Sequence, residues 1–521
     1  MRLTWRKGII GVMACCALTT GAFVQSMSVG RGQLLDQKTT LRISAGALAN
    51  LLTATDAGRQ LMQVAGTPAC DLEVVYVRYG TIGGANESTN ASAALMIPGG
   101  GPACSGPRPT MLYAHGTTTY RNFNIADLTQ TDKSNGDGAS EGLAVAAMYA
   151  AQGYIVVASN YAGYSGSDLA YHPYLNAVQQ SADMIDSLTA GRVAMGGANS
   201  GKLTWENGKL FVTGYSQGGY VAMATQRALQ AAGVNVTAAS MGSGPYALGA
   251  TGDALVAGEV DIGSTVFTTL VATSYQHAYG NVYGSPGDLY EPAYVPGIEQ
   301  LLPSLTSIDV LIGKGKLPAA TLFSLTPPAP QFASLTPPTS PPLVPAVLTP
   351  VFALGFGNGN LVRNAYRLSM LQDELVNPDG AFPNTTAAMA PAANPATPLR
   401  QAFKRNDMRN WTPSSPVQLC GGYADPTVFF FNATIQQAYW KNAKVPAKLT
   451  TVLDVDASII GANDPYAAVK QGFADAKAAL AAQAVAGGAT DGGASAVIEA
   501  YHSGLVAPFC MAAARTFFGN F

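Results

Sequence analysis

The chain has 521 residues, of which 48% are hydrophobic and only 12% are charged, and its net charge is −2. This charged share is about half of that in an ordinary globular protein, which excludes an acidic disordered chain. Basic residues do not outnumber acidic ones and so cannot neutralise phosphates, which also excludes a nucleic acid as a partner. With four histidines and neither a Cys-x-x-Cys nor a His-Glu-x-x-His motif, the sequence does not favour a dedicated zinc site.

Residues 1–26 have the pattern of a signal peptide. Three basic residues come first, the apolar run Gly8–Leu18 follows, and small residues continue to Ala22. That run is too short to span a bilayer, and no later stretch has about 18 uninterrupted apolar residues. We therefore expect a soluble mature protein that is secreted, periplasmic or held at the cell surface. A lipoprotein signal around Cys15 is the alternative.

Cleavage would leave four cysteines: Cys70, Cys104, Cys420 and Cys510. An even number in an oxidising compartment predicts two disulfides, and three pairings are possible. We favour Cys70–Cys104, which would close a strand-rich hairpin, and Cys420–Cys510, which would join two C-terminal segments. Buried free thiols are the alternative.

The first structured region is predicted over residues 72–98, where two alternating stretches flank a turn and indicate an antiparallel pair. Short apolar strands then alternate with helices, with strands at 110–114, 154–158, 209–213 and 236–241 and helices near 141–152, 174–193 and 217–232. This alternation predicts an α/β fold whose mostly parallel sheet is covered by helices on both faces.

The pattern breaks over residues 251–410, a Pro-rich region that contains the repeat Ser-Leu-Thr-Pro-Pro. Prolines at this density do not suit a central sheet. We interpret this region as a cap or lid inserted between core residues 27–250 and 411–521; a linker between two domains is the alternative. The insertion is favoured because the core pattern resumes afterwards, with strands at 417–420 and 450–455 and helices near 465–486 and 506–518.

Two segments match the motif Gly-x-Ser-x-Gly, which is weak evidence in a chain with 57 glycines. Gly138–Gly142 follows a polar loop, and we interpret its Ser140 as a helix N-cap. Gly214–Gly218 directly follows an apolar strand and opens a helix. A sharp strand-to-helix turn of this kind holds the Ser216 hydroxyl clear of the sheet, as a nucleophile requires.

The expected order of a catalytic triad in this topology is Ser, then an acid, then His. Only His277 and His502 follow Ser216. We favour His502, in a loop after the last strand, because His277 falls in the predicted cap. For the acid we favour Asp425, in a turn after a core strand that a Cys420–Cys510 bond would bring towards His502; the competing acids are Asp454 and Asp456.

The oxyanion hole is expected at the end of strand 110–114, where His115-Gly116-Thr117 follows. The backbone N–H of Thr117 would act with that of Gln217, the residue after the nucleophile. His115 is expected to shape this loop rather than to titrate, and His172 is expected to be a loop or site-rim residue.

The segments YAHGTTT, YIVVASNYAGYSGSD, VTGYSQGG, CGGYADPTV and YHSG together resemble bacterial α/β-hydrolases of the secretory lipase (lipase A-like) type. The resemblance covers residues of about 70–250 and 411–521 and is weak in the predicted cap. It implies the α/β-hydrolase fold and ester hydrolysis, with Ser216, Asp425 and His502 on the triad positions and Thr117 and Gln217 in the oxyanion hole. Relatives often carry Asp where this chain has Asn160, which bears on loop geometry.

From these features we expect a serine esterase or lipase that works through an acyl-enzyme, without metal or organic cofactor. The apolar, Pro-rich cap predicts a small-molecule or lipid ester with a hydrophobic acyl or aromatic part, and transient contact with a lipid interface. A peptidase on the same fold, a non-catalytic binding module on a hydrolase scaffold and a polymer depolymerase are the alternatives. The sequence does not predict the oligomeric state.

Overall fold

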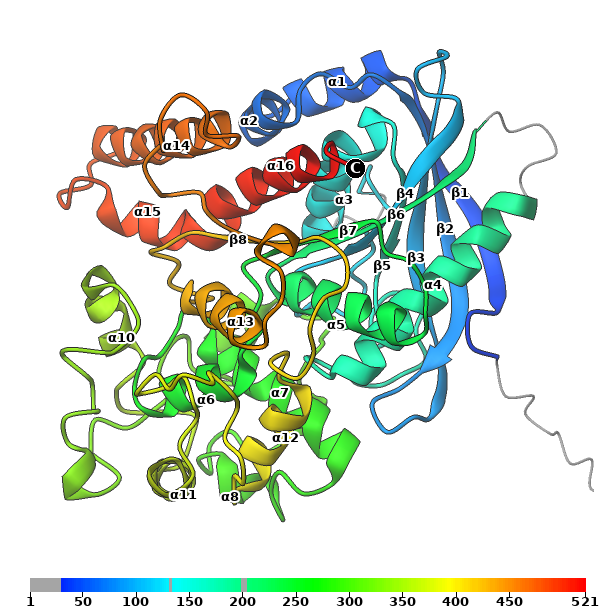
Figure 1. Ribbon diagram of the computed structural model, residues 1–521. Coiled ribbons are helices and arrows are strands. Elements are labelled where there is room, and N and C mark those ends of the chain that lie inside the picture. Colours follow the sequence, from blue (N-terminus) through cyan, green and yellow to red (C-terminus); the bar gives the residue numbers. More distant parts are fainter. Residues whose placement is uncertain (1–29, 131–133, 198–203) are drawn as a thin grey trace, which may run out of the picture.

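A computed structural model describes residues 30–130, 134–197 and 204–521 of the chain, so the predicted signal peptide lies outside the described residues. Its centre is one sheet with the strand order β1-β2-β3-β5-β4-β6-β7-β8-β9 (Figure 1). The strands are β1 (Leu34–Ile43), β2 (Asp71–Ile82), β3 (Ser88–Gly99), β4 (Gly106–Ala114), β5 (Ile155–Ser159), β6 (Thr204–Tyr215), β7 (Ala238–Gly242), β8 (Val417–Gly421) and β9 (Thr450–Asp454).

The sheet is antiparallel at one side and parallel across the rest. Strands β1, β2, β3 and β5 pair antiparallel in that order, and β5, β4, β6, β7, β8 and β9 pair in parallel. Every residue of β5, β7 and β8 is buried, as expected of short apolar strands covered on both faces. The predicted α/β fold with an opening antiparallel pair is confirmed.

Helices cover both faces of the sheet (Figure 1). Helices α4 and α5 pack on one face, and α3 and α16 pack on the other with α2 and α14 outside them. The helices outside the inserted segment are α1 (Ala45–Thr53), α2 (Asp56–Ala65), α3 (Gly136–Met148), α4 (Ala177–Gly197), α5 (Gln217–Ala231), α13 (Phe431–Asn442), α14 (Ala467–Ala486), α15 (Ala494–Ala500) and α16 (Ala507–Phe518). Short 3-10 turns lie at Ala150–Gln152, Ile298–Gln300, Pro330–Phe332, Ala346–Leu348 and Ala447–Leu449.

The segment between β7 and β8, residues 243–416, is called the insert below; it adds no strand to the sheet. Its helices are α6 (Leu248–Val256), α7 (Ser264–Tyr279), α8 (Pro286–Leu289), α9 (Ile308–Gly313), α10 (Thr349–Leu354), α11 (Asn364–Val376) and α12 (Pro398–Asn406). They gather to one side of the sheet, at the lower left of Figure 1, below α13.

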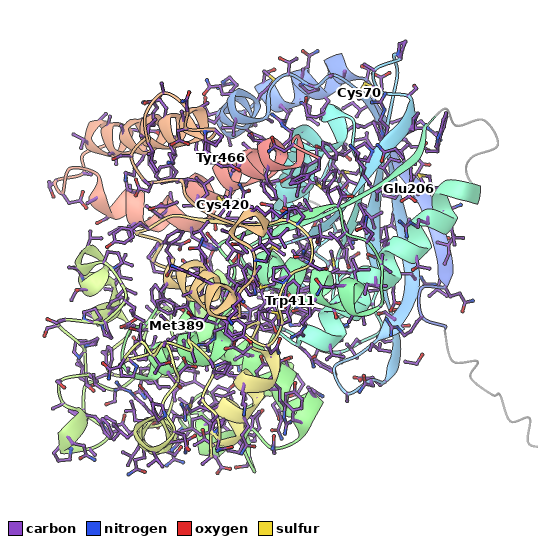
Figure 2. All side chains as sticks on the ribbon, viewed as in Figure 1. Cys70, Glu206, Met389, Trp411, Cys420 and Tyr466 are labelled. Carbon is purple, nitrogen blue, oxygen red and sulfur yellow. A yellow bond between two sulfur atoms is a disulfide. The ribbon has the colours of Figure 1, made fainter. Side chains whose placement is uncertain are left out.

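Two disulfides join distant parts of the chain, Cys70–Cys104 and Cys420–Cys510, which are the favoured pairs. Figure 2 labels one cysteine of each, with Cys70 beside α1 and Cys420 near β8. Cys510 lies in the continuous helical stretch Ala494–Phe518, the one helix of the described residues that is long and apolar enough to cross a membrane. This stretch packs on α14 and on strands β6, β7 and β8, as a core helix does.

Two local expectations are wrong. The expected N-cap Ser140 lies inside α3, which begins at Gly136 with Asn135 as its N-cap. The helix starts early because Gly138 and Gly142 lie directly against the backbone of residues 124–125, where a Cβ would meet main-chain atoms within 3 Å. His502 is not in a loop but in a π-helical turn, Tyr501–Val506, between α15 and α16.

Candidate active site

Ser216 lies in a sharp turn between β6 and α5, with φ +59° and ψ −125°, angles that non-glycine residues seldom adopt. Its N–H donates to the carbonyl of Gly242 on the adjacent strand at 2.9 Å. The turn needs its glycines: a Cβ on Gly218 would lie 2.0 Å from the carbonyl oxygen of Ala114. This close packing of strand and helix holds the serine in its strained conformation.

The structure brings Ser216, His502 and Asp425 together. Nε2 of His502 lies 2.8 Å from Oγ of Ser216, and its Nδ1 lies 2.7 Å from Oδ2 of Asp425. The other oxygen of Asp425 accepts from the backbone N–H groups of Thr427 and Val428 at 2.9 and 3.0 Å. Asp425 is fully buried and His502 is 6% exposed. In this arrangement Nδ1–H donates to the carboxylate and Nε2 accepts from the serine hydroxyl.

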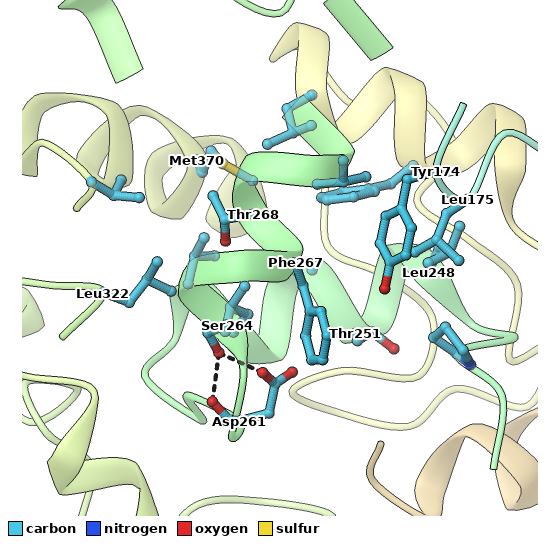
Figure 3. Close-up of a pocket in the computed structure, with 18 of the residues that line it drawn as sticks. Tyr174, Leu175, Leu248, Thr251, Asp261, Ser264, Phe267, Thr268, Leu322 and Met370 are labelled. Atoms are coloured by element: carbon cyan, nitrogen blue, oxygen red, sulfur yellow. Dashed lines mark hydrogen bonds between the residues drawn. The ribbon is translucent and has the colours of Figure 1, made fainter. Parts of the chain in front are cut away.

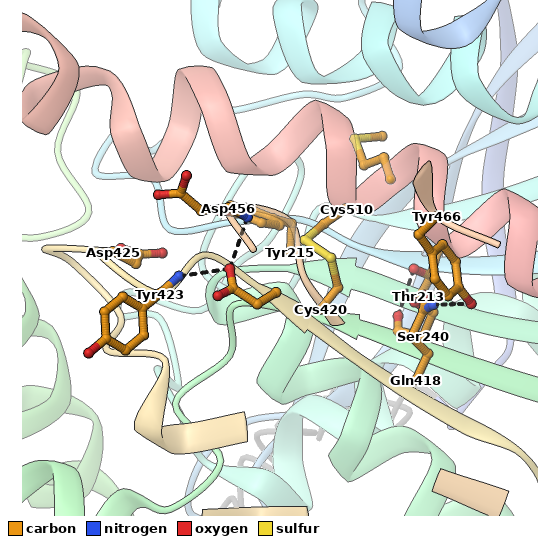
Figure 4. The surroundings of a disulfide bond; sticks show 12 residues. Thr213, Tyr215, Ser240, Gln418, Cys420, Tyr423, Asp425, Asp456, Tyr466 and Cys510 are labelled. Carbon is orange, nitrogen blue, oxygen red and sulfur yellow. Dashed lines mark hydrogen bonds between the residues drawn. A yellow bond between two sulfur atoms is a disulfide. The ribbon is translucent and has the colours of Figure 1, made fainter. Parts of the chain in front are cut away.

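Each of these side chains is held by its own element. Asp425 follows β8, and His502 lies one π-helical turn before α16, so the Cys420–Cys510 bond joins the two elements (Figure 4). Tyr215, the last residue of β6, donates its hydroxyl to the carbonyl of His502 at 2.6 Å. The geometry of the histidine therefore depends on contacts with β6 and β8.

The competing residues contact other groups. Asp454 accepts from the backbone N–H groups of Tyr423 and Asp456. Asp456 accepts from the hydroxyl of Tyr501 and pairs with Lys477. His277 is exposed on α7, and its ring stacks on that of Tyr171. None of the three bonds to Ser216 or His502 among the described residues.

The predicted oxyanion residues lie on either side of the serine. Gln217 is the first residue of α5, and Thr117 lies in the loop after β4. Within the part of the chain that the structure describes, neither backbone N–H donates to another protein group. Their side chains are anchored: Oγ1 of Thr117 lies 3.0 Å from the hydroxyl of Tyr174, and Nε2 of Gln217 lies 2.7 Å from Nε2 of the buried His172.

The loop that carries Thr117 is built on buried polar side chains. Burial lowers the pKa of His115 to about 4, so its ring stays neutral, and it stacks between Phe123 and Tyr161 at 4.3 and 4.0 Å. Glu141, from the motif Gly138–Gly142, accepts from the backbone N–H of Gly116 at 3.2 Å. Burial raises the pKa of this carboxyl to about 7.

Asn160 lies behind this loop and is fully buried. Its amide nitrogen donates to Oγ of Ser92 at 2.9 Å and to Oδ1 of Asn124 at 3.2 Å, and its oxygen accepts from the N–H of Ile125 at 2.8 Å. An amide, with both donors and an acceptor, satisfies all three partners. The hydrogen-bond partners at this position therefore match the amide of Asn160.

A pocket lies against Ser216 and Gln217. Figure 3 shows its lining, which comes largely from the insert, above all α6, α7 and α11. Most lining side chains are apolar; Asp261 is an exception, and it accepts from the hydroxyl of Ser264 at 2.5 Å. Burial raises the pKa of Asp261 to about 7. Sequence reasoning missed these residues because the insert has no regular hydrophobic period.

No group of three or more His, Cys, Asp or Glu side chains among the described residues is placed to hold a metal ion. The chemistry available at this site is that of a serine hydroxyl, an imidazole and a buried carboxylate next to free backbone donors.

The order of the strands, the turn at Ser216 and the position of the histidine after the last strand define an α/β-hydrolase. Comparison with solved structures agrees. The rice cell wall degrading esterase LipA from Xanthomonas oryzae is 26% identical, with 82% of this chain and 91% of that chain covered and a TM-score of 0.61. A protein from Legionella pneumophila shares the fold, at 18% identity, 81% and 91% coverage and a TM-score of 0.58.

No protein-family model matches the sequence, and no curated protein matches it. The chain has the α/β-hydrolase fold and is similar to an esterase of that fold, and it is a carboxylic ester hydrolase.

Proposed function

We propose that the chain is an exported serine esterase that cleaves carboxylic esters with Ser216 as nucleophile, His502 as general base and Asp425 as the orienting acid. The observation that carries this proposal is the unbroken pair of hydrogen bonds from Ser216 through His502 to Asp425, at 2.8 and 2.7 Å. Export is supported by the two disulfides, which form in oxidising compartments, and by the basic and apolar pattern of residues 1–26.

The steps follow from this geometry. Nε2 of His502 takes the hydroxyl proton as Oγ of Ser216 attacks the ester carbonyl, and Asp425 stabilises the imidazolium that forms. The backbone N–H groups of Thr117 and Gln217 donate to the oxyanion of the tetrahedral intermediate. When it collapses, His502 gives the proton to the departing alcohol and the acyl group remains on Ser216. Water, deprotonated by His502, then attacks the acyl-enzyme and releases the acid.

The pocket supports an ester with a hydrophobic acyl or aromatic part. Apolar side chains of the insert, such as Leu248, Phe267 and Met370, line the pocket (Figure 3). We propose that the predicted cap, residues 251–410, acts as the substrate-binding cap of the enzyme and meets lipid interfaces transiently. Apolar binding sites of this kind recognise substrates by burial of apolar surface, with few polar contacts to fix orientation.

The test is hydrolysis of p-nitrophenyl esters from acetyl to palmitoyl by the wild type, Ser216→Ala and Ser140→Ala. Ser140 is the matched control, because it is the central serine of the other Gly-x-Ser-x-Gly motif and is exposed on α3. We expect kcat to fall by about 10⁴- to 10⁶-fold in Ser216→Ala and to be unchanged in Ser140→Ala. Substantial turnover by Ser216→Ala would refute the nucleophile, and faster cleavage of matched amides would favour a peptidase.

A further inference from the structure

The pocket beside Ser216 is also lined by Arg367, an arginine of α11 that is fully buried. Its guanidinium donates to the carbonyls of Val256 and Leu335 at 2.9 and 2.8 Å and to Oγ1 of Thr336 at 3.0 Å. All three acceptors are neutral. A guanidinium carries five N–H groups, so one N–H on each terminal nitrogen is left without a protein acceptor among the described residues.

The charge of Arg367 is uncompensated, unlike that of two other buried arginines of the insert. Arg400 pairs with Asp253 and Asp373, and Arg409 pairs with Asp379 and Asp407, all at 2.7–3.0 Å. Among the described residues no carboxylate lies within ion-pair distance of Arg367. Burial alone lowers its pKa, to about 10, so it remains charged at neutral pH.

Aromatic rings compensate only part of this charge. The guanidinium lies 4.5 Å from the centre of the Phe323 ring and 5.2 Å from that of Phe356. Contacts of this kind are weaker than an ion pair inside a protein, where an unpaired charge is costly. Phe323 lines the pocket together with Arg367, so an anion in the pocket could complete the set of partners.

Arg367 lies on the same face of α11 as Met370, because three residues separate the two along the helix. Met370, one helical turn after Arg367 on α11, and Leu322 lie across the pocket from Tyr174 in Figure 3. Tyr174 is the residue that contacts Thr117. The pocket therefore has a reacting end beside Ser216, an apolar lining and a positive charge at a wall remote from the oxyanion residues.

We propose that Arg367 is a specificity-determining residue that binds an anionic group, most simply a carboxylate, at the far end of the substrate's acyl arm. The acyl arm is the part that stays attached to Ser216 after the alcohol has left, so it is the arm that the pocket must hold through both steps. A carboxylate carries the opposite charge and offers two oxygens as acceptors for the two free N–H groups. This inference rests on the proposed ester hydrolysis at Ser216.

The experiment compares p-nitrophenyl hexanoate with the mono-p-nitrophenyl ester of adipic acid, which has the same length and a terminal carboxylate. The variants are Arg367→Met and, as control, Arg363→Met. Arg363 precedes the same helix, is exposed, and donates to the carbonyl of Gly287. We expect the wild type to favour the adipic ester by about 10- to 100-fold in kcat/KM, Arg367→Met to lose that preference while still cleaving the hexanoate, and Arg363→Met to keep it.

Equal preference in the wild type and Arg367→Met, or a wild-type preference for the hexanoate, would overturn the inference. Calorimetric binding of adipate and hexanoate to the wild type gives a readout that depends neither on turnover nor on the folding of the variant. Tighter binding of adipate by about ten-fold or more would support the role of Arg367. Equal binding would overturn it, whereas failure to cleave either ester would count against the proposed function instead.

Discussion

The disulfide between Cys420 and Cys510 is expected to support both stability and catalysis, whereas Cys70–Cys104 supports stability alone. The reason is their position on the sheet. Cys420 is in β8, just before the turn with Asp425, and Cys510 is in α16, just after the turn with His502. Cys104 precedes β4 and so lies at the opposite edge of the parallel strands from the residues that follow β6 and β8.

Chain entropy sets the size of the effect on stability. For the separations of 90 and 34 residues, removal of the disulfide is expected to lower the free energy of unfolding by about 4.6 and about 3.8 kcal/mol, because the unfolded chain gains conformational freedom. All four cysteines are buried to a similar degree, so the cavities left by alanine largely cancel in the comparison. The two double variants, Cys420→Ala/Cys510→Ala and Cys70→Ala/Cys104→Ala, should therefore lose similar free energies of unfolding.

The effect on catalysis should differ between them. Without the Cys420–Cys510 bond, the turns with Asp425 and His502 are joined only by non-covalent contacts, and a displacement of about 1 Å lowers kcat by about 100-fold. We expect kcat on p-nitrophenyl esters to fall by about 10- to 100-fold in that variant and to stay unchanged in the Cys70–Cys104 variant. Urea unfolding and steady-state kinetics of both proteins check this. Equal losses of kcat, or no loss in either, would refute the link between the disulfide and the site.

Three more results are expected. Burial raises the pKa of Glu259 from 4.5 to about 9, so the folded protein retains a proton that the unfolded chain releases. The stability that this proton contributes is complete at low pH and falls above about pH 4.5, by up to about 1.4 kcal/mol per pH unit, until about pH 9. In urea unfolding, the free energy of unfolding should therefore fall less between pH 5 and pH 9 in Glu259→Gln than in the wild type. An equal fall in the two proteins would contradict this. Glu141→Ala should lower kcat by about ten-fold with KM unchanged, because the N–H of Gly116 loses its acceptor. Glu141→Gln keeps an acceptor oxygen and should restore kcat. Equal kcat values for the two variants would argue against a role of Glu141 in positioning the oxyanion loop. Asn160→Asp should lower the free energy of unfolding by about 1–3 kcal/mol in urea titration, since a carboxylate cannot donate to Ser92.

The parallel core could be predicted because its strands are short, apolar and followed by helices. The two Gly-x-Ser-x-Gly motifs could be separated by what precedes them, a strand for Ser216 and a polar loop for Ser140. Asp425 could be preferred to Asp454 and Asp456 only from the order Ser, acid, His along the chain and from the predicted Cys420–Cys510 bond. Hydrogen bonds between distant turns cannot be predicted from a single sequence. The start of α3 was misplaced because the glycines that allow its close packing resemble a loop.

Other parts of the molecule carry no signal that sequence reasoning could use. Strand β1 was not foreseen: its central residues are polar and largely exposed, as on an edge strand that is paired on one side only. The pocket lining could not be predicted either, since it is assembled from several helices and loops of an insert without regular periodicity. The sequence also does not predict that Arg367 is buried without a carboxylate partner. This depends on which acidic residues the fold brings near it.

The nucleophile and the oxyanion loop are joined by a main-chain contact, which makes them a single mechanical unit. The place where a Cβ on Gly218 would lie is 2.0 Å from the carbonyl oxygen of Ala114 and 2.7 Å from that of His115, the two residues that lead into the loop of Thr117. Any side chain at Gly218 must push either α5 or the end of β4, and so displaces Ser216 or Thr117 relative to the other. The insert is tied to the same loop, because the N–H of Ser304 donates to the carbonyl of Thr119 and the N–H of Arg121 donates to the carbonyl of Ser304, both at 2.8 Å. Substitutions of pocket-lining side chains leave these main-chain contacts in place, so they can change the substrate range while the spacing between the nucleophile and the oxyanion donors is preserved.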